Sequence, residues 1–409
     1  MPSRFHLLIA AQFCSALADH ALLIVAIARL QQMGLAPWLA PLLKFGFTLA
    51  YVVGAPFVGA LADAVPKARL MAWMNGVKLL GALLMLGGLN PLLGFALVGV
   101  GAAAYAPAKY GLVTETVPAR RLVAANGWIE VSVVCAVLLG TVAGGVLVSA
   151  WWLQSAAVRA LGAAADPLAA SLAALLLIYA LAGGLNLGIP DSGARYPAAA
   201  VHPAALLRRF WRDQRLLWRD TGGGRLSLSV TTLFWGVGAT LQFIVLAWAA
   251  EALRLPLSQA AALQGVVAVG VVAGAAAAGR WVPLAAARRM LVFGVMLGLL
   301  LPLFNAVHGP WQAVPLLVAV GAAGGLLVVP LNALLQHRGC RLMSAGRSIA
   351  VQGFNENASV LAMLAGYSAL LALGLPLALI ITGLGLALAG LVTRLWRRET
   401  RAARRRPAA

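Results

Sequence analysis

Ionisable side chains stand inside long apolar runs of this sequence, among them the acids Asp19 and Glu356 and the lysines Lys78 and Lys109. A charge at the centre of a membrane-spanning helix costs about 2.5–3.5 kcal/mol on insertion scales, so we expect these groups to be paired or to line a hydrated cavity. In such a cavity they could bind the charged parts of a small molecule. The alternatives are structural: the acids could hold helices together, and the lysines could form ion pairs or contact lipid headgroups.

Helical spacing gathers further polar residues around these charges. Gln12, Ser15 and Asp19 share one helix face, and Asn126 shares a face with Glu130. The longest polar stripe lies between residues 346 and 372. The pattern predicts a central polar cavity, and the candidate substrate-binding residues are Asp19, Lys78, Lys109, Glu130, Glu356, Gln352, Asn355, Gln242, Trp235 and Gln12.

Two other ionisable residues allow two interpretations each. Lys44 shares a face with Thr48 and Tyr51, but its long side chain could instead reach the outer membrane interface. His20 could be a packed neutral imidazole or a proton relay, because its pKa range permits both.

The composition requires that membrane helices position these residues. Hydrophobic residues make up 62% of the 409 residues and charged residues 10%, whereas soluble domains average about 45–50% and about 25%. This excludes a soluble globular protein and a disordered one. The net charge of +20 sits between apolar runs, so it indicates membrane topology and anionic lipid headgroups and not nucleic acid.

Cutting the chain at charges, Pro and Gly predicts twelve membrane spans of about 20–25 residues. The N-terminal run imitates a signal peptide, but it stays apolar beyond Asp19, so we expect an uncleaved first span. The predicted spans lie near 5–30, 38–62, 69–89, 91–110, 121–149, 165–189, 225–250, 257–281, 287–307, 311–335, 346–372 and 374–396.

Basic residues predict the orientation of these spans. Nearly all of them fall on the side that holds both termini, which the positive-inside rule places in the cytoplasm. Within the connection between the halves, Pro203–Asp220 reads as an amphipathic helix, either a tether or a site for anionic lipid. The predicted parts are an N-terminal six-helix half at 1–189, a basic linker at 190–224, a C-terminal six-helix half at 225–396 and a basic tail at 397–409.

An internal repeat supports two similar halves. The decamers that begin at Arg121 and Arg347 both read Arg-x-x-Ala-x-amide-Gly-aromatic-x-Glu, about half a chain apart. Two six-helix halves repeated in parallel orientation are a known plan of secondary transporters. The repeat therefore favours a transporter over a purely structural membrane protein.

Motifs of other functions are missing. The sequence contains no phosphate-binding loop for ATP, no His-x4-Asp of glycerolipid acyltransferases, and neither HExxH nor GxSxG. Its three cysteines include no CxxC pair, so we expect neither a disulfide framework nor a zinc site. An enzyme is disfavoured, and no cofactor or metal is expected.

A loop between the second and third predicted spans reads Gly59-Ala-Leu-Ala-Asp63-Ala-Val-Pro-Lys67-Ala-Arg69. It resembles the Gly-x-Leu-x-Asp loop of the major facilitator superfamily, which implies twelve transmembrane helices in two pseudo-repeats. An acid and bases at a helix end could latch the two halves in one state and release them in another. The candidate gating residues are Gly59, Asp63, Lys67, Arg69, Arg121 and Arg347.

Longer blocks narrow the resemblance. The segments 11–23, 75–81, 99–111 and 330–336 look like those of the bacterial lysophospholipid transporters and extend over most of the chain. The resemblance implies import of lysophosphatidylethanolamine and lysophosphatidylglycerol across the bacterial inner membrane without ATP. It also implies re-acylation by a cytoplasmic-side acyltransferase/acyl-carrier-protein synthetase.

The resemblance assigns roles in transport to Asp19, Lys78, Lys109 and Glu356. It fails at two positions, because the family has Asn where this chain has His20, and Arg where it has Gln242. Headgroup preference therefore stays open. The competing functions are a proton-coupled drug or small-solute transporter of the same superfamily and a membrane-embedded lipid acyltransferase.

Overall fold

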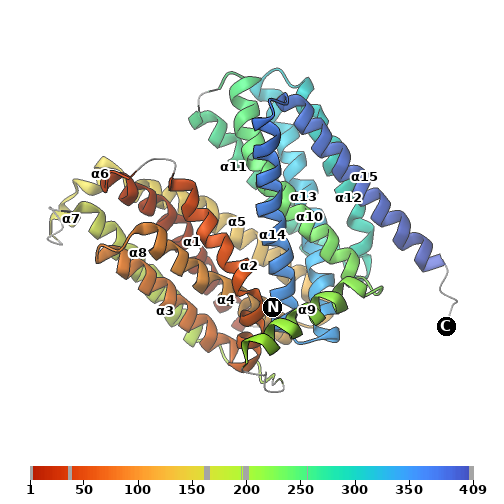
Figure 1. The fold of residues 1–409 in the computed structure, drawn as a ribbon, viewed down its shortest axis with the longest axis horizontal. Helices are drawn as coiled ribbons and strands as arrows, with labels where there is room; N and C mark the ends of the chain where they lie inside the picture. Colours follow the sequence, from red (N-terminus) through yellow and green to blue (C-terminus); the bar gives the residue numbers. More distant parts are fainter. Residues whose placement is uncertain are drawn as a thin grey trace. The chain divides into compact units, whose positions relative to one another are not determined.

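The computed structural model describes residues 3–35, 39–160, 166–194, 196, 202–255 and 257–404, and these residues form helices joined by short turns. Arg195 of the predicted basic linker, the final residues 405–409 of the predicted tail, and parts of the predicted span starts at 38 and 165 lie outside the described residues. The helices of the first half are α1 (Ser3–Gln32), α2 (Ala40–Ala64), α3 (Lys67–Leu86), α4 (Pro91–Thr116), η2 (Ala119–Arg121), α5 (Leu122–Leu147), α6 (Ala150–Leu153), α7 (Ala156–Ala160) and α8 (Pro167–Leu187) (Figure 1).

The second half repeats this order of long helices. It follows the linker helix α9 (Pro203–Arg219), whose arginines alternate with apolar side chains. The helices that follow are α10 (Gly224–Glu251), α11 (Leu257–Trp281), η3 (Leu284–Met290), α12 (Leu291–Leu300), η4 (Leu301–Ala306), α13 (Pro310–Leu342), α14 (Ala345–Ala372) and α15 (Leu377–Arg404) (Figure 1).

Eleven helical segments of the described residues are long and apolar enough to cross a membrane. α14 is the twelfth long helix, and it carries a polar stripe and does not belong to this set. A twelve-helix membrane protein is therefore confirmed. Such a chain must form helices because a lipid-exposed backbone has no water with which to hydrogen-bond.

The contacts between helices divide the chain into two units. Unit 1 contains Met1–Thr116, Ser132–Gln214 and Met343–Phe354, and unit 2 contains Val117–Val131, Arg215–Leu342 and Asn355–Ala409. The first turns of α5 thus belong to unit 2, and the first turns of α14 belong to unit 1. Each unit takes one short segment from the opposite half of the sequence.

Apolar side chains build the interior of unit 1. α3 packs against α4 and α8, α2 packs against α4, and α1 packs against α8. Leu22 and Val25 of α1 meet Leu175 of α8 in one buried cluster. This packing brings the polar faces of α1, α3 and α4 into one region.

Small residues allow close helix contact in unit 2. Gly270 and Gly274 of α11 lie directly against the backbone of α13, and Gly321 and Gly325 of α13 lie against the backbone of α11. A Cβ atom at any of the four would lie less than 3.0 Å from a backbone atom of the neighbouring helix. The four-residue spacing is the small-xxx-small pattern that permits membrane helices to approach closely.

Candidate functional site

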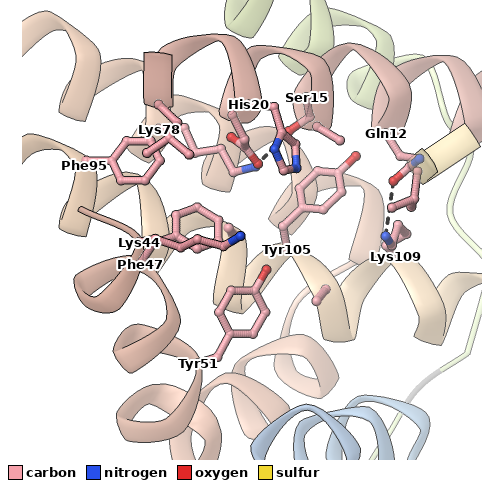
Figure 2. Close-up of a pocket in the computed structure, with 16 residues that line it drawn as sticks. Gln12, Ser15, His20, Lys44, Phe47, Tyr51, Lys78, Phe95, Tyr105 and Lys109 are labelled. Carbon is pink, nitrogen blue, oxygen red and sulfur yellow. Dashed lines mark hydrogen bonds and ion pairs between the residues drawn. The ribbon is translucent and has the colours of Figure 1, made fainter. Parts of the chain in front are cut away.

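A cavity of about 210 Å³ lies within unit 1. Its lining comes from α1, α2, α3 and α4, with one residue of α5 (Figure 2). The polar lining residues are Gln12, Ser15, Asp19, His20, Lys44, Tyr51, Lys78, Tyr105 and Lys109. Four predicted binding residues, Asp19, Lys78, Lys109 and Gln12, are among them.

A buried ion pair forms one wall of the cavity. Lys78 Nζ lies 2.6 Å from Asp19 Oδ2 and donates a second hydrogen bond of 2.9 Å to Ser15 Oγ. The other carboxylate oxygen of Asp19 accepts a 2.9 Å hydrogen bond from the hydroxyl of Tyr179. The Lys78 side chain is 2% exposed and that of Asp19 is 13% exposed, so the charges lie away from bulk water and compensate each other.

Helical periodicity explains why these groups meet. Ser15 and Asp19 are four residues apart on α1, and Asn75 and Lys78 are three apart on α3, so each pair occupies one face. Ser15 Oγ donates a 2.7 Å hydrogen bond to Asn75 Oδ1. Lys78 also lies over the ring of Tyr105, with Nζ 5.2 Å from the ring centroid.

Lys109 is held at another part of the lining. Its Nζ donates a 3.2 Å hydrogen bond to Gln12 Oε1 and lies 4.4 Å from the ring centroid of Tyr110. Gln12 in turn donates to Ser132 Oγ at 2.9 Å. Gln12 and Lys109 are both buried, so this part of the cavity presents a positioned ammonium group with an amide beside it.

Several cavity residues were not among the predicted binding residues. Lys44 and Tyr51 come from α2 and point into the cavity together with His20 (Figure 2). Their shared helix face was visible in the sequence, but it did not distinguish the cavity from the outer interface. Tyr105, and Tyr179 behind the cavity wall, gave no sequence signal beyond being aromatic residues in apolar runs.

The remaining predicted binding residues do not line this cavity. Gln352, near the start of α14, is buried within unit 1. The other five belong to unit 2, and they are Glu130, Glu356, Asn355, Gln242 and Trp235. Glu130 is buried and Gln242 is exposed. Asn355 accepts a 3.3 Å hydrogen bond from Trp218 Nε1.

Three of the predicted gating residues meet at the first turn of α14, within unit 1. The carboxylate of Asp63 accepts hydrogen bonds from Ser344 Oγ and, at 3.2 Å, from the backbone amide of Gly346. Helix N-termini favour negative charge in this way. Gly59, one turn before Asp63, packs against Gly346 and Arg347, and Arg347 forms a two-pronged ion pair with Asp213.

The other gating residues lie elsewhere. Lys67 forms a buried ion pair of 2.5 Å with Glu115, and its Nζ lies 4.8 Å from the ring centroid of Tyr196. Arg69 is exposed on α3, and Arg121 is exposed in unit 2. The predicted gating set therefore separates into an α14 contact, a Lys67 ion pair and two exposed arginines.

An ion pair between Asp220 and Arg338 lies directly before α10 in unit 2. Asp220 forms hydrogen bonds of 3.2 and 2.7 Å with the guanidinium of Arg338. Burial by itself would raise the pKa of Asp220, but the hydrogen bonds from Arg338 and from the backbone amides of Gly224 and Gly222 outweigh burial, so its pKa is lowered. Within the described residues, no group of three or more His, Cys, Asp or Glu side chains could hold a metal ion.

Solved structures of transporters share this fold. A bacterial homologue of the iron transporter ferroportin superposes with a TM-score of 0.70 at 16% identity, covering 97% of this chain and 99% of that one. The transporter FucP gives a TM-score of 0.68 at 18% identity, with 97% and 99% of the two chains covered. At these identities the comparison shows the fold alone.

Sequence comparisons identify the family. The model of the Major Facilitator Superfamily matches residues 8–355. The lysophospholipid transporter LplT of Yersinia pestis (strain Pestoides F) is 44% identical over 367 residues, which cover 90% of this chain and 86% of the relative. That of Yersinia pseudotuberculosis serotype O:3 (strain YPIII) gives the same values. The chain therefore belongs to the Major Facilitator Superfamily and, within it, to the family of these curated lysophospholipid transporters.

Proposed function

We propose that this protein is a secondary transporter that moves lysophospholipids across a membrane. The observation that carries the proposal is the charged cavity of unit 1, which places Lys78, Lys109 and Asp19 among membrane helices. Chains 44% identical over most of the length carry the name of lysophospholipid transporters. A lysophospholipid has a charged headgroup and one acyl chain, which suits a polar cavity embedded in lipid.

The chemistry of the cavity indicates how the headgroup crosses. A phosphate in hydrocarbon would lose its hydration without replacement, whereas ammonium groups and hydroxyls of the cavity can hydrogen-bond it. The cavity volume of about 210 Å³ lies below the range of about 300–1,000 Å³ for sites that enclose whole drug-sized ligands. The headgroup would therefore occupy the cavity while the acyl chain stays in lipid, and alternating access of the two halves would move it across.

We also propose roles in transport for the predicted binding residues outside the cavity and for the predicted gating residues. Gln352, Glu356 and Glu130 would contact the substrate at stages of transport other than its binding in this cavity, as would Asn355, Gln242 and Trp235. Asp63, Gly59 and Arg347 would control the cycle through their contacts at the start of α14. The ion pair of Lys67 and the exposed Arg69 and Arg121 would act at the same membrane face.

We also propose a membrane orientation for the two termini and an enzyme that acts after transport. The distribution of basic residues supports cytoplasmic termini in a bacterial inner membrane. Import of a lysolipid is useful only when an enzyme adds the missing acyl chain, so we place a cytoplasmic-side acyltransferase/acyl-carrier-protein synthetase downstream. A single cysteine introduced at Arg219, in a background without the three native cysteines, should react with an impermeant maleimide only in inside-out vesicles.

Helix α9 is the proposed contact with anionic lipid. It exposes Trp211 (48%) and Leu207 (44%) beside the arginines Arg208, Arg212, Arg215 and Arg219, all of which are exposed. Apolar and basic side chains in this arrangement suit a helix that lies at a negatively charged membrane surface. Uptake should therefore be faster in vesicles with phosphatidylglycerol, and replacing the four arginines with Gln should remove that difference.

The direct test is uptake into proteoliposomes. Fluorescent lysophosphatidylglycerol and lysophosphatidylethanolamine are added outside, and external albumin later extracts whatever remains in the outer leaflet. Protected lipid that is chemically unchanged measures transport. We expect protection well above empty liposomes, and its loss in Asp19→Asn.

The matched control is Asp166→Asn. Asp166 pairs with Arg29 at 2.5 Å but does not line the cavity, so this variant should keep uptake. No protection above empty liposomes in folded protein would overturn the proposal, and a response to a pH gradient in place of lysolipid would favour the proton-coupled transporter. Chemical conversion of the lipid would favour an acyltransferase.

A further inference from the structure

The cavity of unit 1 is elongated along its helices. Its lining on α1 runs from Gln12 to Leu23, and its lining on α4 runs from Phe95 to Lys109. At about 1.5 Å per residue, the lining therefore extends over about 15–20 Å along the helices. Figure 2 shows the two ends, with Phe95 at one end and with Gln12 and Lys109 at the other.

Lys44 lies at the end of the cavity that Phe95 marks. It stands in the first turns of α2, one turn before Phe47. The ring of Phe47 stacks on that of Phe95, with 5.4 Å between the two centroids. Gly99 lies so close to the backbone of Phe47 that a Cβ atom there would be 2.6 Å from Phe47 Cα. These contacts hold α2 against α4 and so position Lys44, which shares a helix face with Phe47.

Lys44 is the most accessible of the four lysines of the chain. Lys67, Lys78 and Lys109 are buried, whereas Lys44 is exposed. Within the described residues, no hydrogen bond or ion pair reaches its ammonium group. Figure 2 shows this group directed into the cavity, which Tyr51 of the same helix also lines. An accessible ammonium with a phenolic hydroxyl in the same lining can bind phosphate oxygens through charge-assisted hydrogen bonds.

We propose that Lys44 is a substrate-binding residue, which binds the phosphate group of a lysophospholipid at this end of the cavity. The inference rests on the transport function and the orientation proposed above. In that orientation α2 begins at the outer face of the membrane, so Lys44 lies where the headgroup of an imported lipid enters. Binding by Lys44 brings the phosphate into the cavity ahead of the Asp19–Lys78 pair, which lies between the two ends.

Chemical modification tests the contact directly. Sulfosuccinimidyl acetate acetylates accessible amines, so in purified protein in a phosphate-free sugar detergent it should modify Lys44 faster than the three buried lysines. Lysophosphatidylglycerol should slow the modification of Lys44 several-fold, as measured by peptide mass spectrometry. A monoacylglycerol with the same acyl chain lacks the phosphate and should not slow it. Equal protection by the two lipids, or no protection by either, would overturn the inference.

Uptake kinetics in proteoliposomes give a second readout. One charge-assisted hydrogen bond corresponds to about a tenfold change in affinity, so Lys44→Gln should raise the lysophosphatidylglycerol concentration for half-maximal uptake by about that factor. The maximal rate should stay close to that of the wild type, because Lys44 acts where the lipid enters. Lys44→Arg keeps the charge and should keep the wild-type concentration. Thermal unfolding of each purified variant confirms that it is folded.

The matched control is Arg29→Gln. Arg29 lies in the last turn of α1, beyond the Lys44 end of the cavity, and pairs with Asp166 at 2.5 Å. It does not line the cavity, so its replacement should leave the half-maximal concentration unchanged. An equal increase in Arg29→Gln and Lys44→Gln would overturn the inference, because positive charge at that end of the helices and not contact with the phosphate would then attract the lipid.

The outcomes separate the role of Lys44 from the transport function. No uptake by the folded wild-type protein above empty liposomes would overturn lysophospholipid transport, and this inference with it. A wild-type half-maximal concentration in folded Lys44→Gln, with or without a lower maximal rate, would overturn phosphate binding by Lys44 and leave transport intact.

Discussion

The ammonium of Lys78 lies 2.6 Å from the carboxylate of Asp19, with the lysine side chain 2% exposed. The two residues come from α3 and α1. Desolvating two charges is costly, and their contact with each other, with Ser15 and Tyr179 and with the ring of Tyr105 compensates that cost. The pair therefore stabilises unit 1 and at the same time sets the charge of the cavity.

This pair predicts a separation of stability from transport. Lys78→Met leaves Asp19 charged and buried, and we expect it to destabilise the protein by about 3–5 kcal/mol. Adding Asp19→Asn removes the uncompensated charge and should recover a large part of that loss, while uptake stays abolished. Thermal unfolding in detergent and uptake in proteoliposomes measure the two effects. A double variant as unstable as Lys78→Met would contradict the compensation argument.

A second buried ion pair contacts two residues of the connection between the halves. Glu115 binds Lys67 and accepts hydrogen bonds from the hydroxyls of Ser192 and Tyr196, at 2.5 and 2.8 Å. Glu115→Gln weakens all three contacts, because charge-assisted hydrogen bonds are about twice as strong as neutral ones. We expect Glu115→Gln to destabilise the protein by about 1–3 kcal/mol in thermal unfolding.

The control for that experiment is Glu251→Gln, at the exposed end of α10. It removes the same charge from a site outside this cluster, so the stability of this variant should stay close to that of the wild type. If the two variants are equally stable, the contacts of Glu115 do not contribute to stability.

The sequence predicted much of the site because helical spacing is regular. The spacing of Gln12, Ser15 and Asp19 placed them on one face of one helix, and they line one cavity. Their partners could not be predicted, because a single sequence does not state which lysine meets Asp19. Tyr179 is 160 residues away from Asp19, and its hydroxyl is indistinguishable in sequence from that of any other tyrosine in an apolar run.

The internal repeat has a structural explanation that the sequence did not reveal. Its two decamers begin in the short segments that the units exchange, Val117–Val131 and Met343–Phe354. In unit 1 the last turns of α2 meet the first turns of α14 at Gly59, and in unit 2 the last turns of α11 meet the first turns of α5 at Gly279. The repeat thus marks equivalent helix contacts, which depend on packing between distant segments.

The lowered pKa of Asp220 predicts a pH dependence of stability. A carboxyl whose folded pKa lies below its ordinary value of 3.8 stabilises the protein above that value, and the stabilisation is lost as the pH falls through the folded pKa. Asp220→Asn should therefore lower stability by about 1–3 kcal/mol at pH 7. The difference from wild type should shrink toward zero below pH 3.8.

Thermal unfolding between pH 7 and pH 3 measures this dependence. Glu251→Gln removes an exposed carboxylate of the same unit and should parallel the wild type over the whole range. A constant difference between Asp220→Asn and wild type at every pH would show that the charge of Asp220 does not contribute, and that its hydrogen bonds act as neutral ones.

The contact at Gly59 yields the last prediction. A Cβ atom at Gly59 would lie 2.9 Å from Ala350 Cβ and 3.0 Å from Arg347 Cα, so Gly59→Ala must push α2 away from α14 and should cost about 1–3 kcal/mol. Gly54, on the same helix, has its nearest neighbour at 3.6 Å, and Gly54→Ala should be neutral or stabilising because Ala is the better helix former. Because the same displacement would separate Asp63 from Gly346, Gly59→Ala should also slow uptake, whereas Gly54→Ala should not. Equal behaviour of the two variants would exclude close packing at Gly59 as a requirement of the transport cycle.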